Sequence, residues 1–296
     1  MWLPIVVVAH LLNASVFIVD KVMLGKTIKN PTVYAVIIGL LSAVVMLLLP
    51  LAPSIPSPML LLEDIASGAA LILALITFFG ALKRLEASRL IPFVGAMIPL
   101  TTFIASFHVL GERLSLQEGI AFILLVGGGV FITLDPQHPN TKNTLKGWIL
   151  AVASVIFFTA SFVSMKHLFN NQAFWSAFIW SRLGSFLVAV ILLGSGVLRR
   201  EIVATIHRLP FKQAAAFLGN QALGAAAFIL LNIAIKLAPS VTIVNALQSV
   251  QYVFVLLFAI IASLKRPTLL KERITPLIIT EKVLAIILIA EGLYLL

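Results

Sequence analysis

The stretch ALKRLEASRLIPFVGAMIPLTTFIASFHVLGERLSLQEGIAFILLVGGGVFI, residues Ala81–Ile132, decides the fold class. It contains two long apolar segments, one from Leu90 and one from Leu116, separated by a short polar turn around Gly111. Each segment is long enough for a helix to cross a bilayer, which takes about 20 residues. Strands of a membrane barrel alternate in polarity and are about ten residues long. The stretch therefore predicts two membrane-spanning helices.

The same kind of segment recurs along the whole chain of 296 residues, which is 61% hydrophobic and 11% charged. Soluble domains are about 45–50% apolar and about 25% charged, so this composition excludes them. The absence of cysteine excludes a disulfide framework and thiolate metal sites. We predict an all-α membrane protein with ten transmembrane helices. The predicted spans are Leu3–Val19, Thr32–Leu51, Ile65–Ala81, Leu90–Val109, Leu116–Thr133, Leu145–Met165, Phe174–Leu193, Ala214–Ile235, Val241–Leu264 and Leu277–Leu295.

The chain divides into two similar halves, residues 1–134 and 145–296, joined by a linker at 135–144. Trp2 and Ala14-Ser15 correspond to Trp148 and Ala160-Ser161 at a constant offset. Later matches follow in the same order: Arg84-Leu85 with Lys236-Leu237, and Glu112-Arg113 with Glu272-Arg273. Five spans per half is an odd number, so the halves are predicted to be inverted repeats. Such repeats place a binding site near the bilayer midplane.

Within Ala81–Ile132, several features resemble the second half of an EamA repeat, of the drug/metabolite transporter superfamily. These are Ser88 after the third span, Pro99, the Gly111-Glu112-Arg113 turn and the glycine-rich last span, Gly127–Gly129. The second copy departs from the pattern, since Gln251 stands where the family proline is expected. The resemblance implies ten helices around a central cavity and transport of small metabolites, often outward.

Basic residues separate the two sides of the predicted membrane protein. Sixteen Lys and Arg residues lie in odd-numbered connections and three, Arg113, Lys166 and Lys236, in even-numbered ones. Short connections rich in Lys and Arg stay cytoplasmic, so both termini are predicted to be extracytoplasmic. The EamA resemblance implies cytoplasmic termini instead, and we follow the local charge. The basic residues form no continuous surface, so no nucleic-acid partner is expected.

Polar residues inside apolar spans need a reason, because a charge at the bilayer centre costs about 2.5–3.5 kcal/mol. Arg182 lies deep in the seventh span, near two tryptophans. Four polar residues in the ninth span recur at i, i+3, i+4 and i+7, which places them on one helix face. The positions predicted to line a substrate cavity are Asn13, Trp175, Trp180, Arg182, Asn220, Gln221, Asn245, Gln248 and Tyr252. The alternatives are helix packing for Arg182 and interhelical amide bonding for the others.

Three acids near the starts of spans are candidates for proton or ion coupling: Asp64, Glu118 and Glu281. Capping of the helix N-terminus is the favoured explanation for Asp64, and pairing with Lys282 or a loop arginine explains the two glutamates more simply than coupling does. No spacing of histidines resembles a metal site. No cofactor is expected, and the lack of nucleophile or nucleotide motifs argues against an enzyme.

These patterns predict a secondary transporter of a small polar or amphipathic metabolite, such as an amino acid, in a prokaryotic cytoplasmic membrane. Transport by alternating access, with export as the direction, is the expectation. The alternatives are a flippase for a lipid-linked sugar or phosphate carrier, whose anionic headgroup would suit Arg182, and a non-transporting membrane assembly subunit. The partners expected are a small-molecule substrate and the lipid bilayer, with a homodimer as one oligomeric state.

The unequal distribution of Lys and Arg residues between the two sets of connections predicts the topology of the chain. A reporter fused after Leu296 should behave as extracytoplasmic, because the odd-numbered connections hold most of the Lys and Arg residues. Paired phosphatase and fluorescent-protein fusions measure this directly. A fusion that fluoresces and has no phosphatase activity would reverse the assignment.

Overall fold

The computed structural model describes residues 2–26, 28, 30–85, 87–133, 144–265 and 276–296, and this part of the chain is helical without any strand. Nine of its segments are long and apolar enough to cross a membrane. The chain is therefore a multi-pass, all-α membrane protein. The elements are α1 (Trp2–Lys26), α2 (Pro31–Leu41), η1 (Ser42–Leu51), α3 (Pro58–Leu82), α4 (Ala87–Val109), α5 (Leu116–Thr133), α6 (Leu145–Asn171), α7 (Phe174–Leu193), α8 (Gly196–Arg208), α9 (Phe211–Leu237), α10 (Val241–Ala246), α11 (Gln248–Lys265) and α12 (Pro276–Tyr294).

The predicted spans correspond to these helices, with three differences. The second span is an α-helix that continues as the 3-10 helix η1, which contains Pro50. The ninth is interrupted at Leu247, between α10 and α11. The segment after the seventh span, expected to be a plain connection, forms the amphipathic helix α8. The tenth predicted span coincides with α12, whose first residues have side chains outside the described part.

The predicted linker, 135–144, lies outside the described residues except for Thr144. This residue caps the N-terminus of α6, since its Oγ1 accepts a hydrogen bond from the backbone N–H of Gly147 at 3.1 Å. Capping by threonine satisfies one of the free donors at a helix start.

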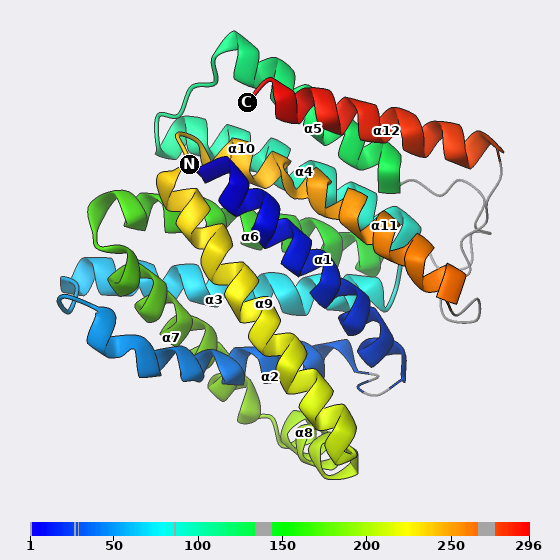
Figure 1. Ribbon diagram of the computed structural model, residues 1–296. Helices are drawn as coiled ribbons and strands as arrows, with labels where there is room; N and C mark the ends of the chain where they lie inside the picture. The colour runs from blue at the N-terminus through cyan, green and yellow to red at the C-terminus, as the bar shows by residue number, and fades with distance from the viewer. Residues whose placement is uncertain (1, 27, 29, 86, 134–143, 266–275) are drawn as a thin grey trace.

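The helices pack in pairs that join the two halves of the chain. Helix α3 of the first half packs on α6 of the second, and α9 of the second half packs on α1 of the first. Likewise, α4 packs on α6 and α11 packs on α1, while α5 pairs with α12. Figure 1 shows α5 and α12 side by side and both chain termini at the same end of the bundle. No half could form this core without the other.

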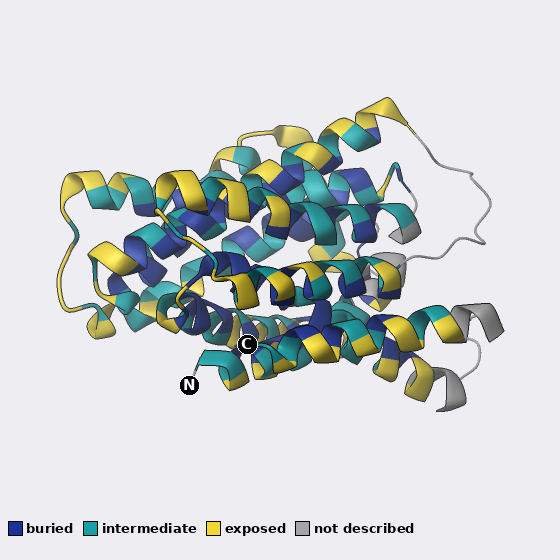
Figure 2. Cartoon of the chain, turned by 90° about the horizontal axis from the view of Figure 1, so that it is seen from above, coloured by how far each residue is buried: buried dark blue, intermediate teal, exposed yellow. Residues whose placement is uncertain are grey.

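Buried residues lie between the helices and exposed residues along their outer faces (Figure 2). Many exposed side chains are large and apolar, such as Leu47 of η1 and Ile123 of α5. In water such a surface would be unfavourable, but lipid chains are as apolar as leucine. The outer face therefore fits contact with lipid.

Glycines permit an unusually close contact between α3 and α7. A Cβ atom added at Gly68 would lie 1.6 Å from the carbonyl oxygen of Ser181, and one at Gly184 would lie 2.0 Å from that of Ile65. The Ser185 hydroxyl also donates to the Gly68 carbonyl at 2.7 Å. Small residues at such contacts are typical of membrane helices, where close backbone approach replaces the hydrophobic effect. This contact fixes the face of α7 that carries Arg182.

Replacing Gly68 with alanine should destabilise the protein by about 3 kcal/mol or more, because the new methyl group meets backbone atoms that cannot rotate away. Thermal unfolding in detergent measures the loss. Gly219→Ala is the control, since nothing lies near a Cβ at that position of α9. Equal melting temperatures for the two variants would contradict the close contact.

Candidate functional site

Arg182 is a buried cation near the middle of α7 with no anion beside it in the described part of the chain. Its side chain is 7% exposed, and Nε and Nη2 have no hydrogen-bond partner. No carboxylate among the described residues lies within ion-pair distance of it. The guanidinium carbon lies 4.5 Å from the ring centroid of Phe228 on α9 and 5.7 Å from that of Phe178.

The two phenylalanines stabilise the charge without using its donors. A cation over an aromatic face gains about 0.5–2 kcal/mol from the ring quadrupole, whereas the N–H groups of a guanidinium point outward in its own plane. Because Nε and Nη2 remain unpaired, this arrangement leaves Arg182 with capacity to bind an anion such as a carboxylate or a phosphate.

Stacked aromatic rings connect Arg182 to one end of the bundle. Phe169 stacks on Phe174 at 5.1 Å, and Phe174 on Phe178 at 5.7 Å. Lys236, near the end of α9, lies 6.0 Å from the Phe174 ring centroid. Residues 169, 174 and 236 lie near the α6–α7 and α9–α10 connections, at one end of the bundle. The series of rings therefore has Lys236 at that end and Arg182 at the other, inside the bundle.

The two tryptophans predicted beside Arg182 have different surroundings. Trp175 packs edge-on against Phe174 and Phe178, within the same aromatic group. Trp180 has a buried Nε1 donor with no hydrogen-bond partner. An unpartnered buried donor is uncommon in proteins and costs about 1–3 kcal/mol.

Asn220 and Gln221 of α9 belong to a separate group with Asp20 and Tyr34. Asn220 donates to Asp20 Oδ1 at 2.6 Å, and Gln221 donates to the Tyr34 hydroxyl at 3.1 Å. Tyr34 in turn donates to Asp20 Oδ1. These side chains are hydrogen-bonded to one another, and none of the described contacts joins them to Arg182.

The predicted polar face of the ninth span lies across the break at Leu247. Asn245 donates to Thr102 Oγ1 on α4 at 3.0 Å, so its amide is interhelical. Tyr252 packs against α4, where a Cβ at Gly95 would lie 2.4 Å from its hydroxyl oxygen. Gln248 makes no hydrogen bond with another described residue, and neither does Asn13 of α1. The buried Ser249 hydroxyl is also unpartnered.

Eight of the nine predicted cavity residues thus form three groups in the structure, and Asn13 of α1 belongs to none of them. One surrounds Arg182, one is the Asp20 network, and one lies between α10–α11 and α4. The sequence predicted one polar surface, because helical periodicity tells which residues share a face but not which neighbouring helix that face meets.

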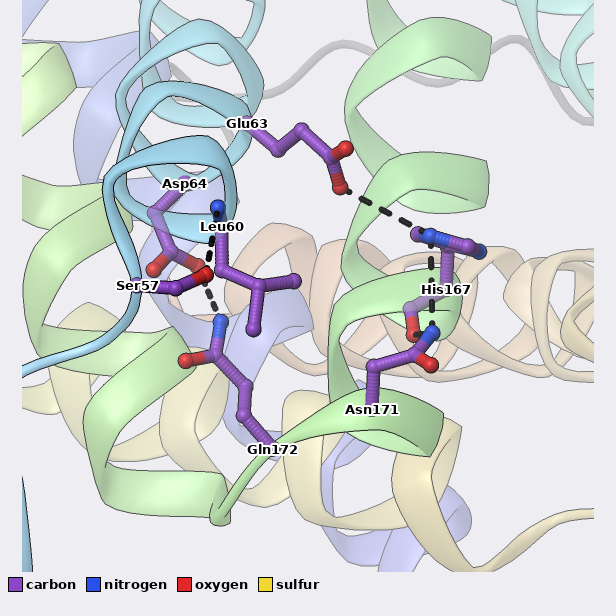
Figure 3. Close-up of polar contacts among 7 residues, drawn as sticks. All are labelled: Ser57, Leu60, Glu63, Asp64, His167, Asn171 and Gln172. Atoms are coloured by element: carbon purple, nitrogen blue, oxygen red, sulfur yellow. Dashed lines mark hydrogen bonds and ion pairs between the residues drawn. The ribbon is translucent and has the colours of Figure 1, made fainter.

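The coupling candidate Asp64 is fully buried at the start of α3. Figure 3 shows its carboxyl facing Gln172, whose Nε2 donates to Asp64 Oδ1 at 2.8 Å, while Asp64 Oδ2 has no partner. The adjacent Glu63 faces His167, with 3.6 Å between Oε2 and Nε2. Asp64 therefore joins α3 to the α6–α7 connection.

The two glutamate candidates have a simpler surrounding. Glu118 forms a capping box at the start of α5: it accepts from the Ser115 backbone N–H at 2.8 Å, and the Ser115 hydroxyl accepts from the Glu118 N–H at 3.2 Å. Glu281 is half-buried on α12 without a hydrogen bond to another described residue, and Lys282 donates to the Ile132 carbonyl instead. The structure gives these acids no shared site.

Sequence reasoning missed Asp20 and Lys166, because it placed both just beyond the ends of spans. α1 and α6 in fact extend past them, so both are inside helices. Lys166 is 6% exposed and donates to the carbonyls of Ile235 and Ala238 at 3.0 and 2.5 Å. The sequence did contain a signal for this pair. Asp20 and Lys166 are 146 residues apart, which is the offset that relates Trp2 to Trp148 in the two similar halves.

No protein-family model and no curated protein matches the chain. A solved crystal structure of a protein does match, with a TM-score of 0.68 over 99% of this chain and 95% of that one, at 16% sequence identity. At that identity the likeness shows the fold alone. The arrangement of helices in this chain is therefore one that a determined structure shares over nearly its full length.

Replacing Lys166 with methionine should lower stability by about 1–3 kcal/mol, because the last carbonyls of α9 would lose their donor inside the bundle. Lys146→Met, at an exposed position of the same helix, is the matched control. Melting temperatures in detergent compare the two. If both variants unfold at the wild-type temperature, Lys166 does not cap α9.

Proposed function

We propose that this protein is a secondary transporter of a small metabolite with an anionic group, such as an amino acid, in a prokaryotic cytoplasmic membrane. The observation that carries the proposal is the Arg182 guanidinium, which is buried at mid-helix with two nitrogens unpaired. A purely structural arginine would be expected to pair with an acid or a carbonyl. A substrate carboxylate would supply the missing partner.

The pairing of helices supports transport by alternating access. In the proposed repeats, α1 to α5 correspond to α6, α7, α9, α10–α11 and α12. The contacts of α3 with α6 and of α9 with α1 are then equivalent, as are those of α4 with α6 and of α11 with α1. Inverted repeats of this kind rock around a shared site in known transporter folds. Ten spans and an EamA-type relationship belong to this proposal.

The proposed orientation places both termini outside the cell. The C-terminal ends of α1 and α3, and helix α8, lie at the end of the bundle opposite the termini (Figure 1). The connections that follow α1, α3 and α7 in the sequence carry much of the Lys and Arg excess, which favours the cytoplasm. Lys166 lies inside α6 and is buried against backbone carbonyls, so it is not one of the loop cations that orient the protein.

Transport by purified protein in liposomes tests the proposal with a panel of radiolabelled amino acids and of uncharged analogues. Arg182→Gln should raise the KM for carboxylate substrates about tenfold or more, because a hydrogen bond to a charged group contributes about 1.5–3 kcal/mol. The melting temperature should stay unchanged, since no protein acid loses its partner. Arg182→Lys should restore part of the affinity, and Arg113→Gln, at an exposed turn, is the control.

The outcomes separate the alternatives. Loss of stability in Arg182→Gln, with equal loss of transport for charged and uncharged substrates, would assign Arg182 to packing. Translocation of anionic lipid-linked sugars, without transport of soluble metabolites, would make the protein a flippase. No movement of either class would favour a membrane assembly subunit.

A further inference from the structure

Asp20 is a half-buried acid of α1 that connects three helices through one oxygen atom. Its Oδ1 accepts from the Tyr34 hydroxyl of α2 and from Asn220 Nδ2 of α9, the latter at 2.6 Å. Gln221 Nε2 of α9 donates to the Tyr34 hydroxyl at 3.1 Å, so the chain of hydrogen bonds returns to α9. We call Asp20, Tyr34, Asn220 and Gln221 the Asp20 network.

The surroundings of the network are apolar and hold it rigidly. Tyr34 is fully buried, and its ring packs edge-to-face between Phe79 of α3 and Phe217 of α9, at 5.7 and 5.5 Å. In a low dielectric such hydrogen bonds are strong, and each bond in a chain polarises the next. The network therefore contributes substantially to the contact of α1 and α2 with α9.

No cation compensates the Asp20 carboxylate among the described side chains, where no Lys or Arg lies within ion-pair distance of it. Tyr34 is the titratable group in direct contact with it. The other titratable groups with described side chains on α1 and on the helices packed against it are His10, Lys212, Lys236 and Tyr252.

The equivalent residue in the second half shows what a purely structural charge looks like. Lys166 donates to backbone carbonyls of the α9 C-terminus, groups that carry permanent partial negative charge. The donors that the described side chains offer Asp20 are a neutral amide and a neutral hydroxyl. These can hydrogen-bond to the carboxyl whether or not it carries a proton.

We propose that Asp20 is a proton-binding site that controls the contact of α1 and α2 with α9. As a carboxylate, it holds the three helices by charge-assisted hydrogen bonds. When a proton binds Oδ2, an O–H bond forms, the negative charge is lost, and the bonds to Oδ1 weaken to neutral ones. The inference rests on the proposed function in one respect: it makes the proton the coupling ion of that transporter.

A cysteine pair measures the contact without any substrate. A Cβ at Gly224 of α9 would lie 3.5 Å from Val16 Cγ1 of α1, one turn from Asp20, and the natural chain has no cysteine. The rate of disulfide formation in V16C/G224C therefore reports how often α1 and α9 meet. Because the thiolate fraction itself rises with pH, each rate is divided by that of the same pair carrying Asp20→Asn.

At about pH 8 the cysteine pair with Asp20 should form its disulfide about fivefold to tenfold faster than the pair carrying Asp20→Asn, because asparagine accepts the same hydrogen bonds without the charge. At about pH 5 this ratio should approach one, because the proposal requires Asp20 to have bound its proton there and so to be neutral like asparagine. Equal ratios at both pH values would overturn the proposal. Failure of transport with a normal pH response would instead count against the proposed function alone.

Tyr34→Phe keeps the test decisive if Asp20→Asn folds poorly. It removes one donor and leaves the acid, so the rate of disulfide formation at about pH 8 should fall about threefold or more below that of V16C/G224C with Tyr34 intact at the same pH. Difference infrared spectra provide a direct readout of the proton. The carboxylic C=O band that forms on acidification should persist in Asp64→Asn and disappear in Asp20→Asn, and its persistence in Asp20→Asn would refute the site.

Discussion

Every backbone N–H and C=O inside a bilayer must find a partner within the protein, and helix ends are where this requirement is hardest to meet. The structure meets it with side chains from neighbouring helices. Lys166 of α6 binds the last carbonyls of α9, and the Glu112 carboxylate accepts from the Val241 N–H at the start of α10. Lys282 of α12 binds the Ile132 carbonyl of α5. Because these partners come from other helices, the hydrogen bonds that satisfy the end of one helix also hold a neighbouring helix against it.

Arg182 is one of the described buried groups that lack such a partner. The close contact of α3 and α7 at Gly68 and Gly184 holds its helix in place, and two aromatic rings lie beside its charge. Yet its Nε and Nη2 donors are left unpaired. Unlike the unpartnered Trp180 indole and Ser249 hydroxyl, the guanidinium carries a charge, and the proposed anionic substrate would supply its partner.

Composition and periodicity were sufficient to predict an all-helical membrane protein and to place nine of its spanning segments, because lipid imposes length and apolarity on each helix separately. The amphipathic helix α8 was missed, since Arg199, Arg200 and Arg208 made its sequence resemble a loop. The candidate site was predicted less well. Arg182 was selected from its charge alone, and of the other candidates Asn220 contacts α1, whereas Asn245 and Tyr252 contact α4. Pairing between helices depends on side-chain packing in three dimensions, which a single sequence does not reveal.

In the proposed repeats, Asp20 and Lys166 occupy equivalent positions, and their opposite charges would make the interior of the bundle electrostatically asymmetric. A duplicated chain with identical halves would carry the same charge at both positions, and its interior would be electrostatically symmetric from one membrane face to the other. Here an acid occupies one position and a base the other, toward opposite ends of the bundle. A charged solute would have different electrostatic energies near the two positions, so the wells and barriers along its path would be asymmetric, while the free-energy difference between the two solutions would still be set by concentration and membrane voltage.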